Sequence, residues 1–82
     1  MSYEYLVFPN YNEGNFLSAC AMMEALLPEL KKNDYLSGVD GPIQNYSFGN
    51  QLLTVYGKIK DDEVSVSSGF PISYLQKRSV TI

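Results

Sequence analysis

The chain has 82 residues, enough for one domain with a single hydrophobic core and too few for a two-domain enzyme with a cleft between its domains. Hydrophobic residues make up 45% of the chain and charged residues 18%, a composition that favours a folded chain over a disordered one. The formal net charge of −3 argues against general nucleic-acid binding, because an acidic chain repels phosphate backbones. We therefore treat residues 1–82 as one folded domain.

Residue types that are absent or rare narrow the chemistry further. The chain has no histidine, so it lacks the most common general base near neutral pH and the most common metal ligand. Its single cysteine, Cys20, cannot form an internal disulfide, which favours a cytoplasmic protein over a disulfide-stapled secreted one. The sequence contains no apolar run near the roughly 18 residues that a membrane span needs. We expect no enzyme activity, no cofactor, no metal site and no membrane insertion.

The first predicted element is a strand over residues 3–8, an aromatic and β-branched run that Pro9 ends. Its central residues are all apolar, so both faces of the strand are apolar. Such a pattern is typical of a central strand or of a strand covered on two sides.

A helix is predicted over residues 13–32. Its apolar positions recur on one helical stripe: Phe16, Cys20, Met23, Leu27 and Leu30. Asn12 or Asn15 can cap the start by accepting hydrogen bonds from free backbone N–H groups. Pro28 removes one backbone hydrogen bond inside this range, so we expect a kink there or a break into two short helices.

The glycine, serine and aspartate residues of 33–42 predict the longest loop of the chain. Gly49 and Asn50 then form a two-residue hairpin turn between strands at 43–48 and 51–59. This turn places Tyr46 opposite Leu53.

A second connection, over residues 60–63, is expected to pair Ile59 with Val64. Both turns select the same buried face, made of Tyr46, Phe48, Leu53, Val55, Ile59, Val64 and Val66. The sequence therefore predicts an α+β fold, in which one amphipathic helix packs on an antiparallel sheet of about four strands. The order along the chain is β-α-β-β-β, with a short C-terminal helix, a strand or both over residues 71–82.

Three groups of polar residues are candidate sites, and each has a structural explanation. Residues 10–15 lead into the helix and can hold an anion there, but their glycine spacing matches no phosphate loop, which favours a simple turn and cap. Cys20 lies on the apolar stripe without a neighbouring cation, which favours a buried core thiol. The carboxylates belong to separate turns and fit no calcium-loop spacing: Asp34, Asp40, Asp61, Asp62 and Glu63.

The aromatic residues carry more information about function. Seven tyrosines and four phenylalanines exceed what one small core needs, and tyrosine is a preferred residue at protein interfaces. On the predicted loop and on the outer face of the sheet, the candidate protein-binding residues are Tyr35, Leu36, Leu52 and Tyr56. The alternative is that tyrosine simply lines the rim of a small sheet.

These observations predict a small cytoplasmic protein-interaction module that binds another protein, as an inhibitor, an immunity or antitoxin-like protein, or an accessory factor. One alternative is a self-associating homodimer built through an open sheet edge or through the face that carries Leu52 and Tyr56. Another is a small-ligand binder that uses the long loop and the turn at 10–15. No nucleic acid, membrane, cofactor or metal is expected as a partner.

Overall fold

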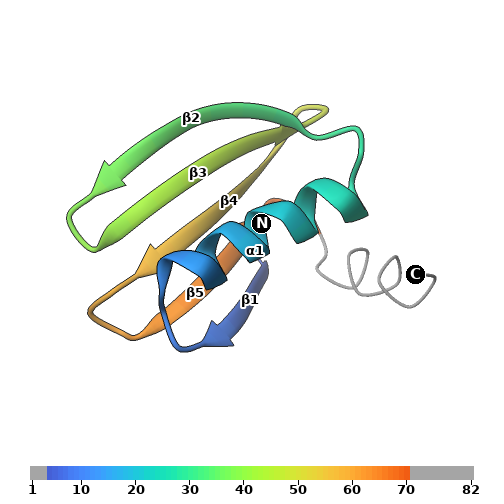
Figure 1. Ribbon diagram of the computed structural model, residues 1–82. Coiled ribbons are helices and arrows are strands. Elements are labelled where there is room, and N and C mark those ends of the chain that lie inside the picture. The colour runs from blue at the N-terminus through green and yellow to red at the C-terminus, as the bar shows by residue number, and fades with distance from the viewer. Residues whose placement is uncertain (1–3, 71–82) are drawn as a thin grey trace.

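The computed structural model of the protein describes residues 4–70, with side chains from residue 6 onward, and contains one helix packed on a five-stranded antiparallel sheet (Figure 1). The elements in chain order are β1 (Glu4–Pro9), α1 (Glu13–Leu26), β2 (Lys31–Gly38), β3 (Gly41–Phe48), β4 (Gln51–Lys58) and β5 (Glu63–Ser68). The strands lie in the order β1-β5-β4-β3-β2. The predicted α+β class is confirmed, but the described sheet has five strands rather than four. The element predicted over residues 71–82 lies outside the described residues.

Helix α1 ends at Leu26 rather than at residue 32, and Pro28 is the reason. Leu27 caps the helix with φ −127° and ψ 80°, outside the helical region that proline disfavours for the residue before it. At the other end, the Asn12 side chain accepts a hydrogen bond from the Asn15 N–H at 2.8 Å, which confirms Asn12 as the cap. The proline therefore breaks the helix, and the chain continues into a strand.

The prediction of a loop over residues 33–42 is wrong, because most of this segment forms β2 and the start of β3. In the β2·β3 pairing, Lys32 lies opposite Tyr46 whereas Tyr35 lies opposite Gln44, so two residues of β2 face one residue of β3. This β-bulge interrupts the alternation of side chains that identifies a strand in sequence.

Gln44 holds the bulge in place from the helix side of the sheet. Its side chain is 4% exposed, and its Nε2 donates to the carbonyl oxygens of Asn33 at 3.1 Å and Asp34 at 3.4 Å. A bulge leaves such carbonyl groups without ladder partners, and the amide supplies the missing donor.

The predicted hairpin between β3 and β4 is confirmed, with Tyr46 opposite Leu53 and Gly49 at φ +62° in the first turn position. The second predicted register is wrong, because Val64 pairs with Gly57 and not with Ile59. A shift of two residues keeps every side chain on its predicted face, since strands alternate with a period of two. Only Ile59 changes environment: it lies in the turn and is 58% exposed.

The core lies between α1 and the facing side of β3, β4 and β5. Its members are Phe16, Ala19, Cys20, Met23, Leu26, Leu27, Tyr46, Leu53, Val55, Val64 and Val66. The helix stripe predicted from the sequence is confirmed as far as α1 extends, with Phe16, Cys20 and Met23 buried. Leu27 is buried at the cap, and Leu30 lies beyond the helix and is partly buried. Gly57 makes room for Tyr11 and Pro42, because a Cβ atom there would lie 2.6 Å from Tyr11 Cε1.

Strand β1 lies at an edge of the sheet that the described residues form, where a central position or cover on two sides was expected. Among the described residues it pairs with β5 alone. Leu6 and Phe8 pack against the core, whereas Val7 is 57% exposed on the face away from α1. Among the described residues, the exposed Val7 accounts for the apolar character of the face away from α1.

We expect Leu27→Ala to lower the free energy of unfolding by about 2–5 kcal/mol, because the Leu27 side chain is fully buried and its removal leaves a cavity. Urea denaturation measures this loss. Leu17, 57% exposed on the same helix, is the matched control, and Leu17→Ala should change stability by less than about 0.5 kcal/mol. Equal unfolding midpoints for Leu27→Ala and the wild type would contradict the assigned helix face.

Gln44→Met keeps a side chain of similar size but removes the donor that satisfies the bulge. We expect a loss of about 1–3 kcal/mol in the free energy of unfolding, because the Asn33 and Asp34 carbonyls lose their side-chain partner. Thermal and urea unfolding of the variant test this loss. A variant as stable as the wild type would mean that water replaces the amide at no cost.

Candidate functional site

The outer face of the sheet, away from α1, carries a row of side chains that crosses all five strands. Successive pairings place its members opposite one another: Leu36, Ile43, Tyr56, Ser65 and Val7. At about 4.8 Å between neighbouring strands, this outer row extends about 19 Å. Its end members are the most open, with Leu36 at 50% and Val7 at 57% exposure, and Ile43 and Tyr56 are half-buried between them.

Polar pairs border the outer row on both sides. On one side, Thr54 Oγ1 donates to Asn45 Oδ1 at 3.0 Å. On the other side, Lys58 Nζ lies 3.9 Å from Glu63 Oε2. An apolar centre inside a polar frame is the arrangement found at protein interfaces.

Ser65 is the one polar member of the outer row, and it is covered by its neighbours. It is only 1% exposed, and its Oγ has no hydrogen-bond partner among the described residues. Tyr56 and Val7 lie on either side of it in the neighbouring strands. A partner that docks here therefore meets the larger apolar side chains rather than the hydroxyl group.

The four predicted binding residues do not all lie on the same face of the sheet. Leu36 and Tyr56 belong to the outer row, and Leu52 lies on the same face, 60% exposed, at about 13 Å along β4 from Tyr56. Tyr35 lies on the opposite face, where its ring meets Phe16 edge-on with centroids 6.4 Å apart. Tyr35 and Leu36 were predicted in one loop, but they are adjacent residues of a strand and so point to opposite sides.

The bulge decides which of these two residues faces outward. If the pairing of Lys32 with Tyr46 continued unchanged along β2, Tyr35 would lie opposite Ile43 on the outer face. The extra residue shifts the register by one, so Leu36 takes that place instead.

Sequence reasoning missed two members of the outer row, Ile43 and Val7. The confirmed hairpin at Gly49 was a sufficient signal for Ile43, because its register extends to the pair of Ile43 with Tyr56. No local signal identifies Val7, because its place in the row depends on the pairing of the first strand with the last.

Hydrogen bonds within the chain already use the polar groups of the turn before α1. Asn15 Nδ2 donates to the Asn10 carbonyl oxygen at 2.7 Å, and the Tyr11 N–H donates to Asp62 Oδ1 at 2.9 Å. A carboxylate already lies next to the helix start and would repel a bound anion. The geometry supports the reading of this segment as a turn and cap.

On the helix side of the sheet, Tyr46, Glu24, Lys32 and Cys20 form a group of polar side chains. Within this group, Tyr46 OH donates to Glu24 Oε2 at 2.6 Å. Burial, and then the hydrogen bond to Glu24, raises the pKa of Tyr46 well above its ordinary value. Burial likewise raises the pKa of the Cys20 thiol. Lys32 Nζ completes the group at 4.0 Å from Glu24 Oε2. The phenol and the thiol therefore stay protonated near neutral pH, and the group ties α1 to β3 and β2.

Within residues 4–70, no three histidine, cysteine, aspartate or glutamate side chains are arranged to hold a metal ion. The helix in this range is too short to cross a membrane. Comparisons of the chain with protein families, curated proteins and solved structures found no match.

Cys20 should react slowly with iodoacetamide in the native protein, because its thiol is buried and its raised pKa lowers the thiolate fraction at any given pH. We expect a rate at pH 8 at least about tenfold below that of the chain unfolded in urea. Mass spectrometry of the alkylated fraction over time measures both rates. Equal rates would show that the thiol is open to solvent.

Proposed function

We propose that this chain is a cytoplasmic protein-interaction module that acts by covering a surface of another protein with the outer face of its sheet. The observation that supports this most directly is the outer row, with Leu36, Ile43 and Tyr56 in register between polar borders. Exposed aromatic and aliphatic side chains inside a polar frame are the usual anchors of protein complexes.

Tyr56 is well placed to act as the central anchor. It lies on β4, which is hydrogen-bonded to β3 on one side and to β5 on the other, so its backbone is held by two ladders. A side chain on such a rigid platform loses little freedom when a partner covers it. The neighbouring polar pairs can then exchange hydrogen bonds with the rim of the partner.

The charge distribution favours a basic partner. The β2–β3 and β4–β5 turns meet where the Ile59 N–H donates to the Asp40 carbonyl oxygen at 2.8 Å, and Asp61 and Asp62 follow in the second turn. With a net charge of −3 for the whole chain, this end attracts positively charged surfaces. Covering the surface of a partner protein is the action expected of an inhibitor, of an immunity or antitoxin-like protein, or of an accessory factor. The free, buried Cys20 thiol accords with a reducing compartment.

The test is capture of a partner by the tagged wild-type protein, followed by affinity measurement with Tyr56→Ala. We expect this variant to weaken the complex by about 1–3 kcal/mol, because it removes an aromatic anchor at the centre of the interface. Isothermal titration calorimetry measures the affinity, and a urea midpoint close to that of the wild type shows that the fold is kept.

Val39→Ala is the matched control, because Val39 is fully exposed in the β2–β3 turn and lies outside the outer row. It should leave the affinity unchanged. If Tyr56→Ala binds the captured partner as tightly as the wild type, the outer row is not the binding surface.

A further inference from the structure

The two edges of the sheet differ in how they are protected from pairing with another strand. β2 begins with Lys31 and Lys32 and contains the bulge, and both features discourage an incoming strand. β1 pairs with β5 without any register shift and carries no charge after Glu4. No segment among residues 4–70 pairs with its other side. Within residues 4–70, β1 is therefore the edge without a bulge or a lysine, and Pro9 at its end is its one residue that discourages pairing.

Hydrogen bonding at the end of β1 indicates which backbone groups face this open edge. The Asn10 N–H donates to the Asp62 carbonyl oxygen at 2.9 Å, in the same register as the rest of the β1·β5 pair. Bonded residues alternate along an antiparallel ladder, so Phe8 bonds to β5, whereas Val7 and Pro9 turn their backbone groups outward. Pro9 has no N–H to offer and is tolerated on that side. The Val7 N–H and C=O remain available to another strand.

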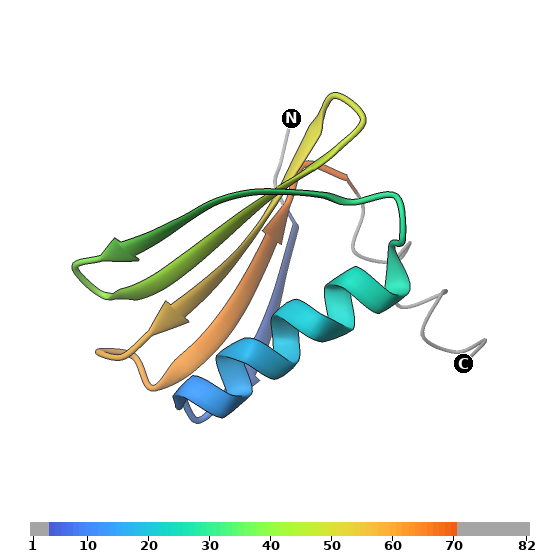
Figure 2. The same ribbon diagram turned by 45° about the horizontal axis from the view of Figure 1, so that its top comes forward.

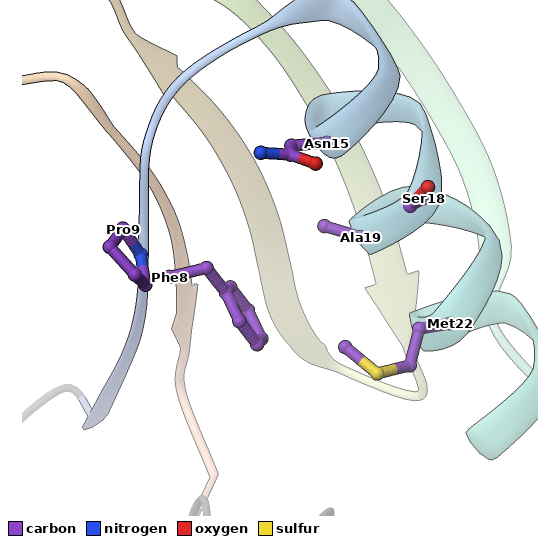
Figure 3. A pocket seen from close by; sticks show the side chains of 6 residues that line it. All are labelled: Phe8, Pro9, Asn15, Ser18, Ala19 and Met22. Atoms are coloured by element: carbon purple, nitrogen blue, oxygen red, sulfur yellow. The ribbon is translucent and has the colours of Figure 1, made fainter.

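Both faces beside this edge offer apolar contacts to an added strand. On the outer face Val7 is 57% exposed. On the helix face, a pocket of about 330 Å³ opens between β1 and α1, and Figure 3 shows Phe8 and Met22 pointing towards each other across it. The pocket is lined by Phe8, Pro9, Asn15, Ser18, Ala19 and Met22. A strand added to an edge sends alternate side chains to the two faces, so it would use both.

A second copy of β1 fits this edge. An antiparallel pair about a two-fold axis perpendicular to the sheet keeps both helices on one side, so Leu6 and Phe8 of one copy lie beside the pocket of the other. The Val7 side chains meet near the axis on the outer face.

We propose that the β1 edge, with the pocket beside it, is a homodimer interface in which two copies form one continuous sheet. The interaction is main-chain hydrogen bonding between the two β1 strands, supported by apolar contacts on both faces. It differs from the proposed binding of a foreign protein, which depends on Tyr56 in the centre of the sheet, and the two surfaces share Val7 at the end of the outer row.

Sedimentation velocity over a range of concentrations tests this interface with Val7→Lys. The fold should tolerate this change, because the Val7 side chain is exposed, but two lysines near the axis repel each other and protect the edge. We expect a monomer–dimer equilibrium for the wild type and a monomer for Val7→Lys at the same concentrations. Val39→Lys, the same substitution at a fully exposed turn position, should dimerise like the wild type.

Amide hydrogen exchange provides the second measurement. Exchange of the outward-facing Val7 amide should slow as the wild-type concentration rises, and it should stay fast in Val7→Lys. A wild type that is monomeric up to its solubility limit overturns the proposal, as does a dimer that Val7→Lys leaves intact. Protection of the Val7 amide at every concentration would mean that the same chain covers the edge, which also overturns it. A dimer lost in Tyr56→Ala but kept in Val7→Lys would place self-association on the outer face instead.

Discussion

The break that Pro28 imposes on the helix is the constraint on which the rest of the fold depends. Helix α1 has 14 residues and is therefore about 21 Å long. It carries the chain from β1 at one edge to the start of β2 at the other edge (Figure 2). A helix that continued to residue 32 would consume the start of β2. β3 would then lose part of its partner.

The two halves of the molecule are held together differently. On the β2 side, polar contacts add to the apolar core, because Tyr46 bonds to Glu24 of α1 and Gln44 bonds to the bulge of the neighbouring strand. On the β1 side, apolar contacts by Leu6 and Phe8 hold the strand to the core, and a pocket remains between β1 and α1. Among the described residues, the only helix packs on the opposite face, so no helix of residues 4–70 covers the outer face of the sheet. Both proposed interaction surfaces lie outside the contact between α1 and the centre of the sheet.

Predictions from the sequence succeeded where one local signal determined the geometry. The Gly49-Asn50 turn specified the β3·β4 register, because a two-residue loop permits only one pairing of its flanking residues. The helix stripe and the Asn12 cap followed from spacing along one helix. The register predicted from the second turn was wrong by two residues, because a connection of several residues is compatible with more than one register of the strands that it joins. Even so, Val64 and Val66 lie on the predicted face, since an even shift preserves the alternation.

By itself, the sequence determined the fold class, the buried helix stripe and the outward position of Leu52 and Tyr56, because each depends on neighbours within one helix or one hairpin. The tertiary structure decided which other residues lie with Tyr56 in the outer row. Val7 reaches the outer row only because the first strand pairs with the last. Leu36 rather than Tyr35 faces outward only because the bulge, satisfied by Gln44, shifts β2 by one residue. Strand pairing across the chain and the satisfaction of bulge carbonyls are long-range interactions, and no local pattern of residues encodes them.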